Sequence, residues 1–456
     1  MNKTEYTSAL LREKYTYIQH ASGLPIYVFP KKMTNTYALF STKYGSLDTT
    51  FAVGEGKPVT VPDGIAHFLE HKLFEAPDGS DAFARFSALG ADSNAYTDYD
   101  KTAYLFSCTE HVEEALAELL NFVTEPYFTK ESVAREMGII GEEIHEDEDS
   151  PWERAYLGLV TSLYHKNPVR NNVLGTRKTI SKITPELLYE CYNAFYRLDN
   201  MALVVCGNVT PDEVLAVADR VLPATREEKE PVRRIFPEEP ETVRRTRANA
   251  KMQVAKPIFY IGIKDNIIPE DPTERLKRDL SVALLNEILF SQAGTFYSQL
   301  FEEGLVSPSF SFGYSSDNSQ FAFTCISGES KNPEAVYDSM MDYLEGVQKT
   351  GLSDEDFERC RRVMYADEVR AYDSTDEIAN RLLSFVFDGS QIFDVPTVLQ
   401  SIKKEELEEL LHTLYQPKHF AMSVVRRFKA TQTERKTVCW KKPLYHFPVL
   451  ALRKQS

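Results

Sequence analysis

Residues 63–74 read DGIAHFLEHKLF, and the rest of the chain is organised around this stretch. Its apolar residues predict a helix. Pro62 and Asp63 supply a start signal, with Asp63 as the expected N-cap, and Pro77-Asp78-Gly79 supplies the stop.

Within this helix, His67, Glu70 and His71 follow the order H-x-x-E-H, the inverse of the H-E-x-x-H zinc helix. At about 100° per residue, the two histidines fall on one face a single turn apart, so both imidazoles can reach one ion. Glu70 lies on the flank of that face, where it can contact a water without being a ligand. The pattern predicts metal-assisted hydrolysis with a carboxylate base. The alternative is that three polar residues share a surface helix by chance.

Length and composition restrict the class of protein. The chain has 456 residues, which predicts two or three domains, and 43% hydrophobic residues provide material for sizeable cores. A formal net charge of −16 argues against nucleic acid or an anionic membrane as the main partner. Acidic proteins of this kind are common, so the charge by itself predicts no substrate.

The sequence favours a cytoplasmic location. The first twenty residues hold no uninterrupted apolar segment of the kind found in signal peptides, and no stretch approaches the ~20 apolar residues of a membrane span. The cysteines show no C-x-x-C spacing, which predicts buried, reduced thiols. The six are Cys108, Cys191, Cys206, Cys325, Cys360 and Cys439.

Hydrophobic periodicity predicts an alternation of strands and helices before residue 210. The expected strands are 26–29, 36–40, 91–100, 102–108 and 201–206, and the expected helices are 63–74, 81–89, 111–123, a long one from 129, and 187–196. The charged, proline-bearing stretch 223–250 has little periodicity and reads as a connection between two halves. We therefore predict a first domain at 1–228, a linker at 229–250 and a second domain at 251–456.

The second half resembles the first. Residues 321–325 (FAFTC) match 104–108 (YLFSC), and residues 285–290 (LNEILF) match 69–74 (LEHKLF). In that register, Ala283, Asn286 and Glu287 stand where the first half has His67, Glu70 and His71. We therefore expect two related α/β domains, of which only the first binds a metal.

A catalytic zinc site usually has three protein ligands, and the helix from Thr129 offers several carboxylates. Glu136 and Glu143 lie two turns apart and border an apolar stripe that should pack inward. Glu143 is therefore the predicted ligand, and Glu136 is predicted to orient a ligand by hydrogen bonding. Spacing alone leaves Glu142 open as an alternative. The stripe consists of Val133, Met137, Ile140 and Ile144.

Together, HFLEH and EMGIIGEEI resemble the M16 (pitrilysin-type) zinc peptidases, which include insulin-degrading enzyme and the mitochondrial processing peptidases. Bacterial YmfH-type members with HFLEHKLFE are the most similar. Three further segments, NAYTDYDKTAYLFS, LLYECYNAFY and LDNMALVVCGNV, extend the resemblance over nearly the whole chain. It implies an α+β chain of two homologous α/β domains of the LuxS/mitochondrial-processing-peptidase-like metallohydrolase fold, each a mostly antiparallel sheet flanked by helices.

The resemblance also implies roles for particular residues. His67, His71 and Glu143 would bind one Zn²⁺ per chain, Glu70 would activate the water, and Glu136 would support the site. The strand around Asn94 and Ala95 would accept an extended peptide as an added strand. A turn-capping role for Asn94 is an equally good reading of that residue.

The chain departs from the family pattern in two places. Many relatives place the ligand glutamate a few residues further from the second histidine, which by counting alone leaves Glu148 open. Relatives also carry an arginine and a tyrosine in the second half that grip the substrate, whereas Phe301 and Pro308 stand there in this chain. In the family's heterodimers a metal-free partner chain supplies that pair. We therefore expect such a partner chain or, less favourably, a second copy of this chain. The peptidase activity of the isolated chain is then in doubt.

The resulting expectation is a zinc metalloendopeptidase acting on peptides or unfolded segments within a heterodimeric chamber. One rival is a peptide-binding or assembly subunit that barely cleaves. Another is a metal-dependent hydrolase or lyase acting on a small molecule.

Overall fold

Each half of the chain builds its own mixed sheet in the computed structural model, which describes residues 3–77, 79–317 and 320–428. Asp78 of the expected stop signal and Cys439 lie outside these residues. The first sheet has the order β1 (Lys3–Ser8), β2 (Glu13–Gln19), β3 (Pro25–Pro30), β9 (Met201–Gly207), β4 (Thr36–Thr42), β8 (Thr102–Cys108) and β7 (Asp92–Thr97). The second has the order β11 (Arg247–Met252), β15 (Phe420–Arg427), β12 (Ile258–Asp265), β14 (Ala322–Glu329) and β13 (Ser311–Ser316).

The two sheets share one topology. Strands β11-β15-β12-β14-β13 repeat the order β3-β9-β4-β8-β7. In each of these five-strand runs the first pair is parallel, β3 with β9 and β11 with β15, and the other pairs are antiparallel. The predicted α+β class with two related domains is confirmed.

The helices fall between these strands in both halves. In the first half they are α1 (Ile65–Leu73), α2 (Ala82–Ala88), α3 (Val112–Thr124), α4 (Lys130–Asp149), α5 (Pro151–Leu163), α6 (Arg177–Ile180), α7 (Pro185–Phe195) and α8 (Pro211–Val221). In the second they are α9 (Pro272–Phe290), α10 (Thr295–Glu302), α11 (Pro333–Thr350), α12 (Asp354–Arg370), α13 (Thr375–Asp388), α14 (Val395–Ser401) and α15 (Lys404–Leu414).

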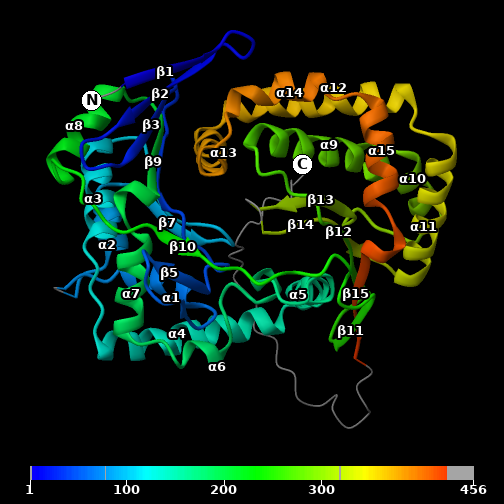
Figure 1. Ribbon diagram of the computed structural model, residues 1–456, viewed down its shortest axis with the longest axis horizontal. Coiled ribbons are helices and arrows are strands. Elements are labelled where there is room, and N and C mark those ends of the chain that lie inside the picture. Colours follow the sequence, from blue (N-terminus) through cyan, green and yellow to red (C-terminus); the bar gives the residue numbers. More distant parts are fainter. Residues whose placement is uncertain (1–2, 78, 318–319, 429–456) are drawn as a thin grey trace.

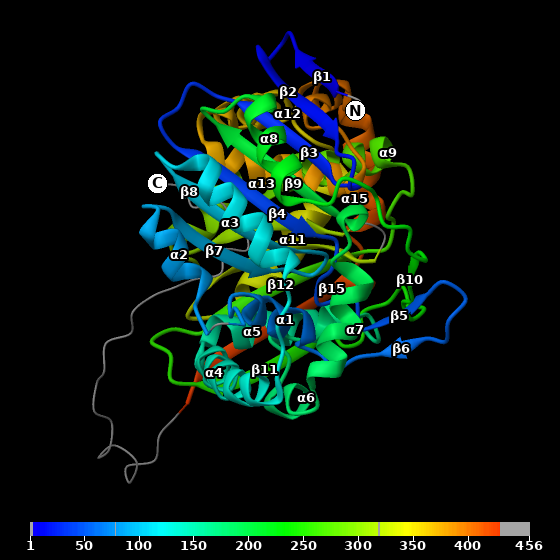
Figure 2. The ribbon, with the colours of Figure 1, turned by 90° about the vertical axis from the view of Figure 1, so that its left-hand side faces the viewer.

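Strand alternation gives the first sheet two apolar faces. On β4, Ala38 and Phe40 join the core beneath the first half's own helices, while Tyr37 and Leu39 point to the opposite face. Figure 2 shows α3 and α8 in front of the sheet, on the side away from the second half. The opposite face is covered by α13, which belongs to the second half.

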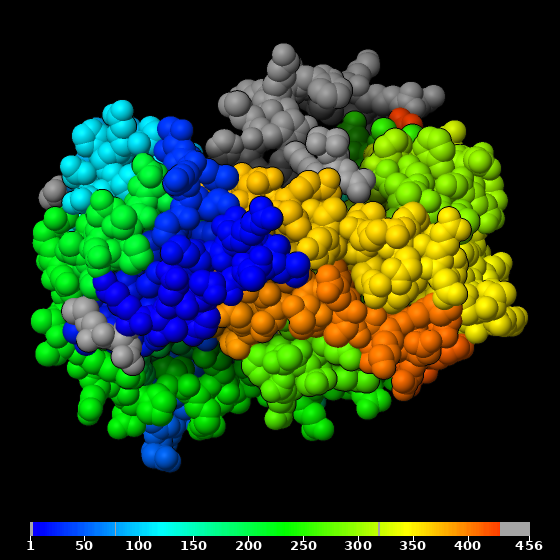
Figure 3. All heavy atoms as spheres, turned by 90° about the horizontal axis from the view of Figure 1, so that it is seen from above, coloured from blue at the N-terminus to red at the C-terminus, as the bar shows by residue number. Residues whose placement is uncertain are grey.

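The second sheet is covered in the reciprocal way. Helix α5, from the first half, packs on β12, β15 and β11 through Leu159 and Leu163. One helix from each half thus covers the sheet of the other half, as Figure 1 shows for α5 and α13. The β1–β2 hairpin also contacts the second half, because Tyr15 Oη donates a hydrogen bond to Gln391 Oε1 at 2.6 Å. Figure 3 shows this N-terminal segment, in blue, against the orange part of the second half.

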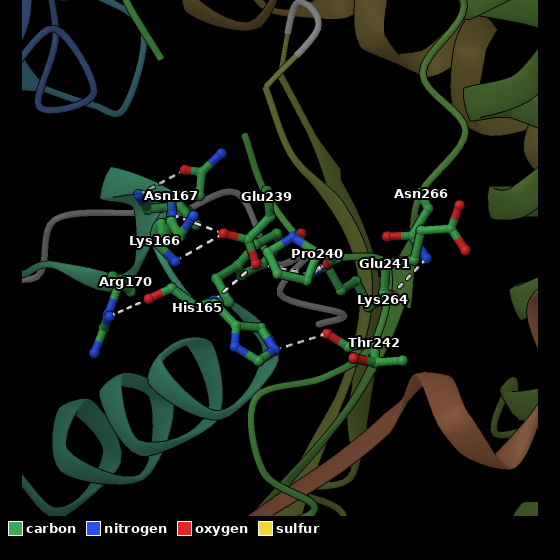
Figure 4. A network of polar contacts seen from close by, with 12 residues as sticks. His165, Lys166, Asn167, Arg170, Glu239, Pro240, Glu241, Thr242, Lys264 and Asn266 are labelled. Atoms are coloured by element: carbon green, nitrogen blue, oxygen red, sulfur yellow. Dashed lines mark hydrogen bonds and ion pairs between the residues drawn. The ribbon is translucent and has the colours of Figure 1, made fainter. Parts of the chain in front are cut away.

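The stretch 229–250, expected as a linker, contains two strands. Here β10 (Val232–Arg234) pairs with β5 (Thr50–Val53), which also pairs with β6 (Val59–Thr60), and β11 begins at Arg247. Between them, the Glu239 carboxylate accepts hydrogen bonds from the backbone N–H groups of residues 165, 166 and 167 and from Lys264 Nζ (Figure 4). The connection is therefore fastened both to the loop after α5 and to the second sheet. The boundaries 1–228, 229–250 and 251–456 stay a prediction.

Among the described helices, no single one has the length and apolarity to cross a membrane. Helix α13 and the segment Ile392–Ser401 meet the length and composition criteria only as a pair, and that pair is bent by 100°. Most of the apolar side chains of α13 are buried against the first sheet.

Candidate metal centre

Helix α1 starts one residue later than the sequence predicts. Its N-cap is Gly64, with φ of +92°, and the prediction of Asp63 as N-cap is wrong. A Cβ at residue 64 would lie 2.4 Å from the carbonyl oxygen of Leu174, so only glycine fits there. The Asp63 carboxylate instead accepts a hydrogen bond from Asn171 Nδ2 at 3.0 Å. The loop around 171–175 therefore fixes where the helix begins.

Helix α4 presents the carboxylates that face α1. Thr129 caps it by accepting the backbone N–H of Ser132, and the helix runs to Asp149, as predicted. Val133, Ile140 and Ile144 are buried, which confirms most of the predicted inward stripe. Because these residues set the rotation of α4, Glu136 and Glu143 lie at the boundary beside α1.

His67, His71 and Glu143 converge. Their ligand atoms lie within 4.8 Å of one another, and among the described residues they form the one group of three or more His, Cys, Asp or Glu side chains that does so. His67 Nε2 lies 3.6 Å from Glu143 Oε1, and His71 Nε2 lies 3.6 Å from Glu143 Oε2.

These spacings fit a metal better than they fit hydrogen bonds. Ligands ~2.0–2.2 Å from a tetrahedral zinc are themselves separated by about 3.4 Å, close to the observed 3.6 Å. The separation is long for a charge-assisted hydrogen bond. Glu143 Oε2 is also buried without a hydrogen-bond partner, a costly state unless a cation satisfies it. Two imidazoles and a carboxylate are a usual donor set for catalytic zinc, so these residues fit the ion.

Glu136 contacts one of the two histidines. Its Oε1 lies 3.0 Å from His71 Nδ1. When Nδ1 donates its proton to Glu136, Nε2 is left with a lone pair directed at the cluster. The geometry predicted for Glu136 is therefore present.

The other candidate glutamates point elsewhere. Glu142 is exposed and pairs with Arg177 Nη2 at 3.1 Å. Glu148 is exposed and is not part of the cluster. The geometry thus favours Glu143 over both alternatives.

The charges of the cluster shift two pKa values in opposite directions. Burial acts to lower the pKa of His71, but the hydrogen bond to Glu136 and the nearby carboxylates of Glu70, Glu143 and Glu136 raise it overall. Burial acts to raise the pKa of Glu143, but His67 and His71 lower it overall. The carboxylates thus surround His71 with negative charge, and the lowered pKa of Glu143 favours its ionised form, both of which suit cation binding.

Glu70 is buried beside the cluster. Its Oε2 accepts a hydrogen bond of 2.6 Å from Thr97 Oγ1, at the end of β7. Glu70 is not a member of the ligand group formed by His67, His71 and Glu143.

Strand β7, which carries Asn94 and Ala95, is one of the two edge strands of the first sheet. The outer side of such an edge can pair with an extended peptide. Asn94 Oδ1 accepts the backbone N–H of Ala95 at 2.9 Å, so this side chain must move if a peptide is to use that N–H group.

The cluster and the edge strand line one cavity of about 2460 Å³. Its opposite wall comes from the second half, including Glu287, Arg381 and Ser384. In the second half, Asn286 is buried and hydrogen-bonded to Thr324, and no metal-binding group forms there among the described residues.

Comparisons with known proteins identify the family of this chain. The family model described as insulinase (peptidase family M16) matches residues 59–177, and the model described as the peptidase M16 inactive domain matches residues 182–364. An uncharacterized zinc protease of Bacillus subtilis, YmfH, is 38% identical over 404 residues, covering 88% of this chain and 94% of that protein. The chain belongs to peptidase family M16.

Solved structures support this membership. An M16-like peptidase from Alicyclobacillus acidocaldarius has a TM-score of 0.86 and 33% identity, covering 91% of this M16 chain and 98% of that one. A protease from Helicobacter pylori has a TM-score of 0.77 at 17% identity, covering 91% and 99%, which shows the shared fold. The predicted resemblance to the family is confirmed.

Sequence reasoning missed two sets of residues at the site. Thr97 lies within a segment that carried the resemblance, but no spacing rule connects it to Glu70, because strand β7 and helix α1 meet only in the fold. The wall residues from α9 and α13 had no signal at all, since a cavity between two halves leaves no local pattern.

Proposed function

We propose that this M16 chain is a zinc-dependent endopeptidase that hydrolyses peptides or unfolded polypeptide segments. The observation that carries the proposal is the convergence of His67, His71 and Glu143 on the cavity wall, with the buried Glu70 carboxylate beside them. Among the residues that the structure describes, only the first half has such a metal-binding group, and the Glu70 carboxylate lies beside it.

Each residue has a distinct task in this proposal. His67, His71 and Glu143 hold Zn²⁺, which supplies Lewis-acid activation of a water and of the peptide carbonyl when bound. Glu70 takes the proton of the attacking water and later gives it to the leaving amine. The free edge of β7 holds the substrate backbone in extended form by main-chain hydrogen bonds.

The size of the cavity supports a polymeric substrate. Small-molecule sites usually enclose ~300–1,000 Å³, whereas this cavity measures about 2460 Å³ and lies between two halves. A hydrolase or lyase acting on a small metabolite would have no use for so large a space.

The proposal includes a partner chain, most favourably a related metal-free one that forms a heterodimer. Phe301 stands where relatives carry a substrate-gripping arginine, and its side chain is 50% exposed on α10. A partner chain would then supply the residues that hold the substrate. The alternative function is a weakly active or non-catalytic peptide-binding subunit, to which the match of residues 182–364 to an inactive-domain model lends support.

We also propose a cytoplasmic setting. All five cysteines in the described part of the chain are free and buried, as reduced thiols would be in that compartment.

The decisive experiment compares the chain with Glu70→Gln, each alone and co-purified with a neighbouring gene product. We expect about one zinc per chain in both proteins and cleavage of a quenched-peptide library by the parent only. Zinc-free preparations in every case would overturn the metal assignment. Equal turnover by Glu70→Gln would remove Glu70 as the base. Full zinc without cleavage, even with the partner, would favour the peptide-binding alternative.

A further inference from the structure

One hydroxyl joins the proposed base to the substrate edge. Thr97 is the last residue of β7, and its Oγ1 lies 2.6 Å from Glu70 Oε2. Among the described residues, the Glu70 carboxylate accepts no other hydrogen bond. Thr97 lies on the same edge strand as Asn94 and Ala95, and the side chains of Thr97 and Glu70 both line the cavity.

The direction of this hydrogen bond follows from the protons that the neighbouring groups can give. Thr102 faces Thr97 across the β7–β8 ladder, and its Oγ1 lies 2.9 Å from the carbonyl oxygen of Tyr44. A carbonyl can only accept, so the single Thr102 proton goes to Tyr44. Thr102 therefore has no proton to give to Thr97, and Glu70 when ionised can only accept, so Thr97 is the donor in the 2.6 Å contact with Glu70 Oε2. The two threonine oxygens themselves are 3.3 Å apart.

We infer that Thr97 is a positioning residue for Glu70. Its hydroxyl occupies one carboxylate oxygen and holds the side chain in one rotamer, which leaves the second oxygen to take the proton of the attacking water. A hydroxyl bonded to a carboxylate is a charge-assisted contact, stronger than a neutral one and sensitive to geometry.

This inference rests on the proposed function, because it assigns Thr97 a part in the same reaction. It also has a consequence for substrate binding. A peptide that adds to β7 contacts the strand whose last residue holds the base, so ordering of this edge and alignment of Glu70 are coupled through Thr97. No ligand of the cluster is involved in that contact.

The kinetic test uses two substitutions at Thr97 and one control. Thr97→Val removes the hydroxyl at nearly constant shape, and Thr97→Ser retains it. Thr42→Val is the matched control, because Thr42 is a buried threonine whose hydroxyl donates to the Phe195 carbonyl at 2.7 Å and not to Glu70. All three are assayed for zinc content, kcat and KM on one peptide.

We expect Thr97→Val to keep its zinc and its KM and to lower kcat by about 10- to 100-fold. Thr97→Ser should recover kcat to within a few-fold of the parent, and Thr42→Val should keep the parental kcat. Loss of zinc in Thr97→Val, or an unchanged kcat, would overturn the inference. An equal loss in Thr42→Val would show that the effect is general to buried hydroxyls.

A second measurement does not depend on activity. In zinc-free protein, the urea midpoints of Thr97→Val, Glu70→Ala and the double variant form a double-mutant cycle. We expect the double variant to shift the midpoint by less than the sum of the single shifts. Additive shifts would contradict the contact. If the chain proves to have no peptidase activity, this cycle still decides whether Thr97 holds Glu70, so the two failures are distinguishable.

Discussion

Two glutamates that are adjacent in the sequence have opposite surroundings in the fold. Glu143 lies 3.6 Å from both His67 and His71, whereas Glu142 is exposed and pairs with Arg177. Adjacent residues on a helix differ by about 100° in direction, so only one of them can face α1. This contrast supplies a matched pair of variants.

We expect Glu143→Gln to lower zinc affinity by at least ~100-fold, because an amide oxygen is a far weaker ligand than a carboxylate. Glu142→Gln should bind zinc as the parent does, since its ion pair with Arg177 is exposed and contributes little. Competition against a zinc chelator measures both affinities. The reverse ranking would move the ligand by one residue and disagree with the structure.

At the residue scale, the sequence correctly predicted features that depend on the periodicity of a single helix. The apolar stripe of α4 predicted the side on which Glu136 and Glu143 lie, because helical periodicity is local. It failed for the start of α1, where Gly64 is required by the Leu174 carbonyl, more than a hundred residues away. No property of residues 62–66 carries that information.

At the scale of elements, the contact between α5 and the second sheet is very close. A Cβ added at Gly158 would lie 2.3 Å from Ser423 Oγ and 3.3 Å from Ser423 Cβ on β15. Gly138, on α4, has nothing within 4 Å of the same added atom. The two glycines test whether packing or helix propensity decides stability.

Alanine favours a helix over glycine by about 1 kcal/mol, so Gly138→Ala should raise the free energy of unfolding by nearly that amount. Gly158→Ala should instead lower it by about 1–3 kcal/mol, because the overlap with Ser423 forces α5 away from the sheet. Urea denaturation of both variants measures the difference. A gain at residue 158 would show that Ser423 rotates away without cost.

The segment around Glu239 makes the stability of the connection between the halves depend on pH. Burial acts to raise the pKa of Glu239, but three backbone N–H groups and the Lys264 ammonium lower it below its ordinary value of 4.5. A carboxylate whose pKa is lowered on folding stabilises the protein above the unfolded pKa. That stabilisation is lost as the pH falls through the folded pKa.

We therefore expect Glu239→Gln to lower the free energy of unfolding by about 2 kcal/mol at pH 7 and by progressively less as the pH falls below 4.5. Thermal unfolding over a pH series measures this. The neighbouring Glu238→Gln is the control, because Glu238 is exposed, and it should show no such trend. A loss for Glu239→Gln that stays constant down to acidic pH would argue against the ionised carboxylate as the cause.

At the scale of the whole molecule, sequence patterns predicted the repeat but could not predict the exchange of helices between the halves. The similarity of residues 104–108 to 321–325 predicted two related sheets, and the matching strand order confirms it. Helix α5 was not predicted at all, and nothing in α13 says which sheet it covers. An apolar helix face indicates that the helix packs against another element, but it does not indicate which element that is.

This exchange predicts that neither half folds alone. In a fragment of residues 1–228, the sheet face formed by Phe29, Leu39 and Val204 would lose α13, and Leu159 on α5 would lose the second sheet. Each fragment expressed separately should bind a hydrophobic dye and show no cooperative unfolding transition. Co-expression of 1–228 with 229–456 should restore a soluble complex that binds zinc, because the lost contacts are between the fragments rather than within them. Cooperative unfolding of isolated 1–228 would mean that its own core suffices and that α13 contributes little to the first sheet.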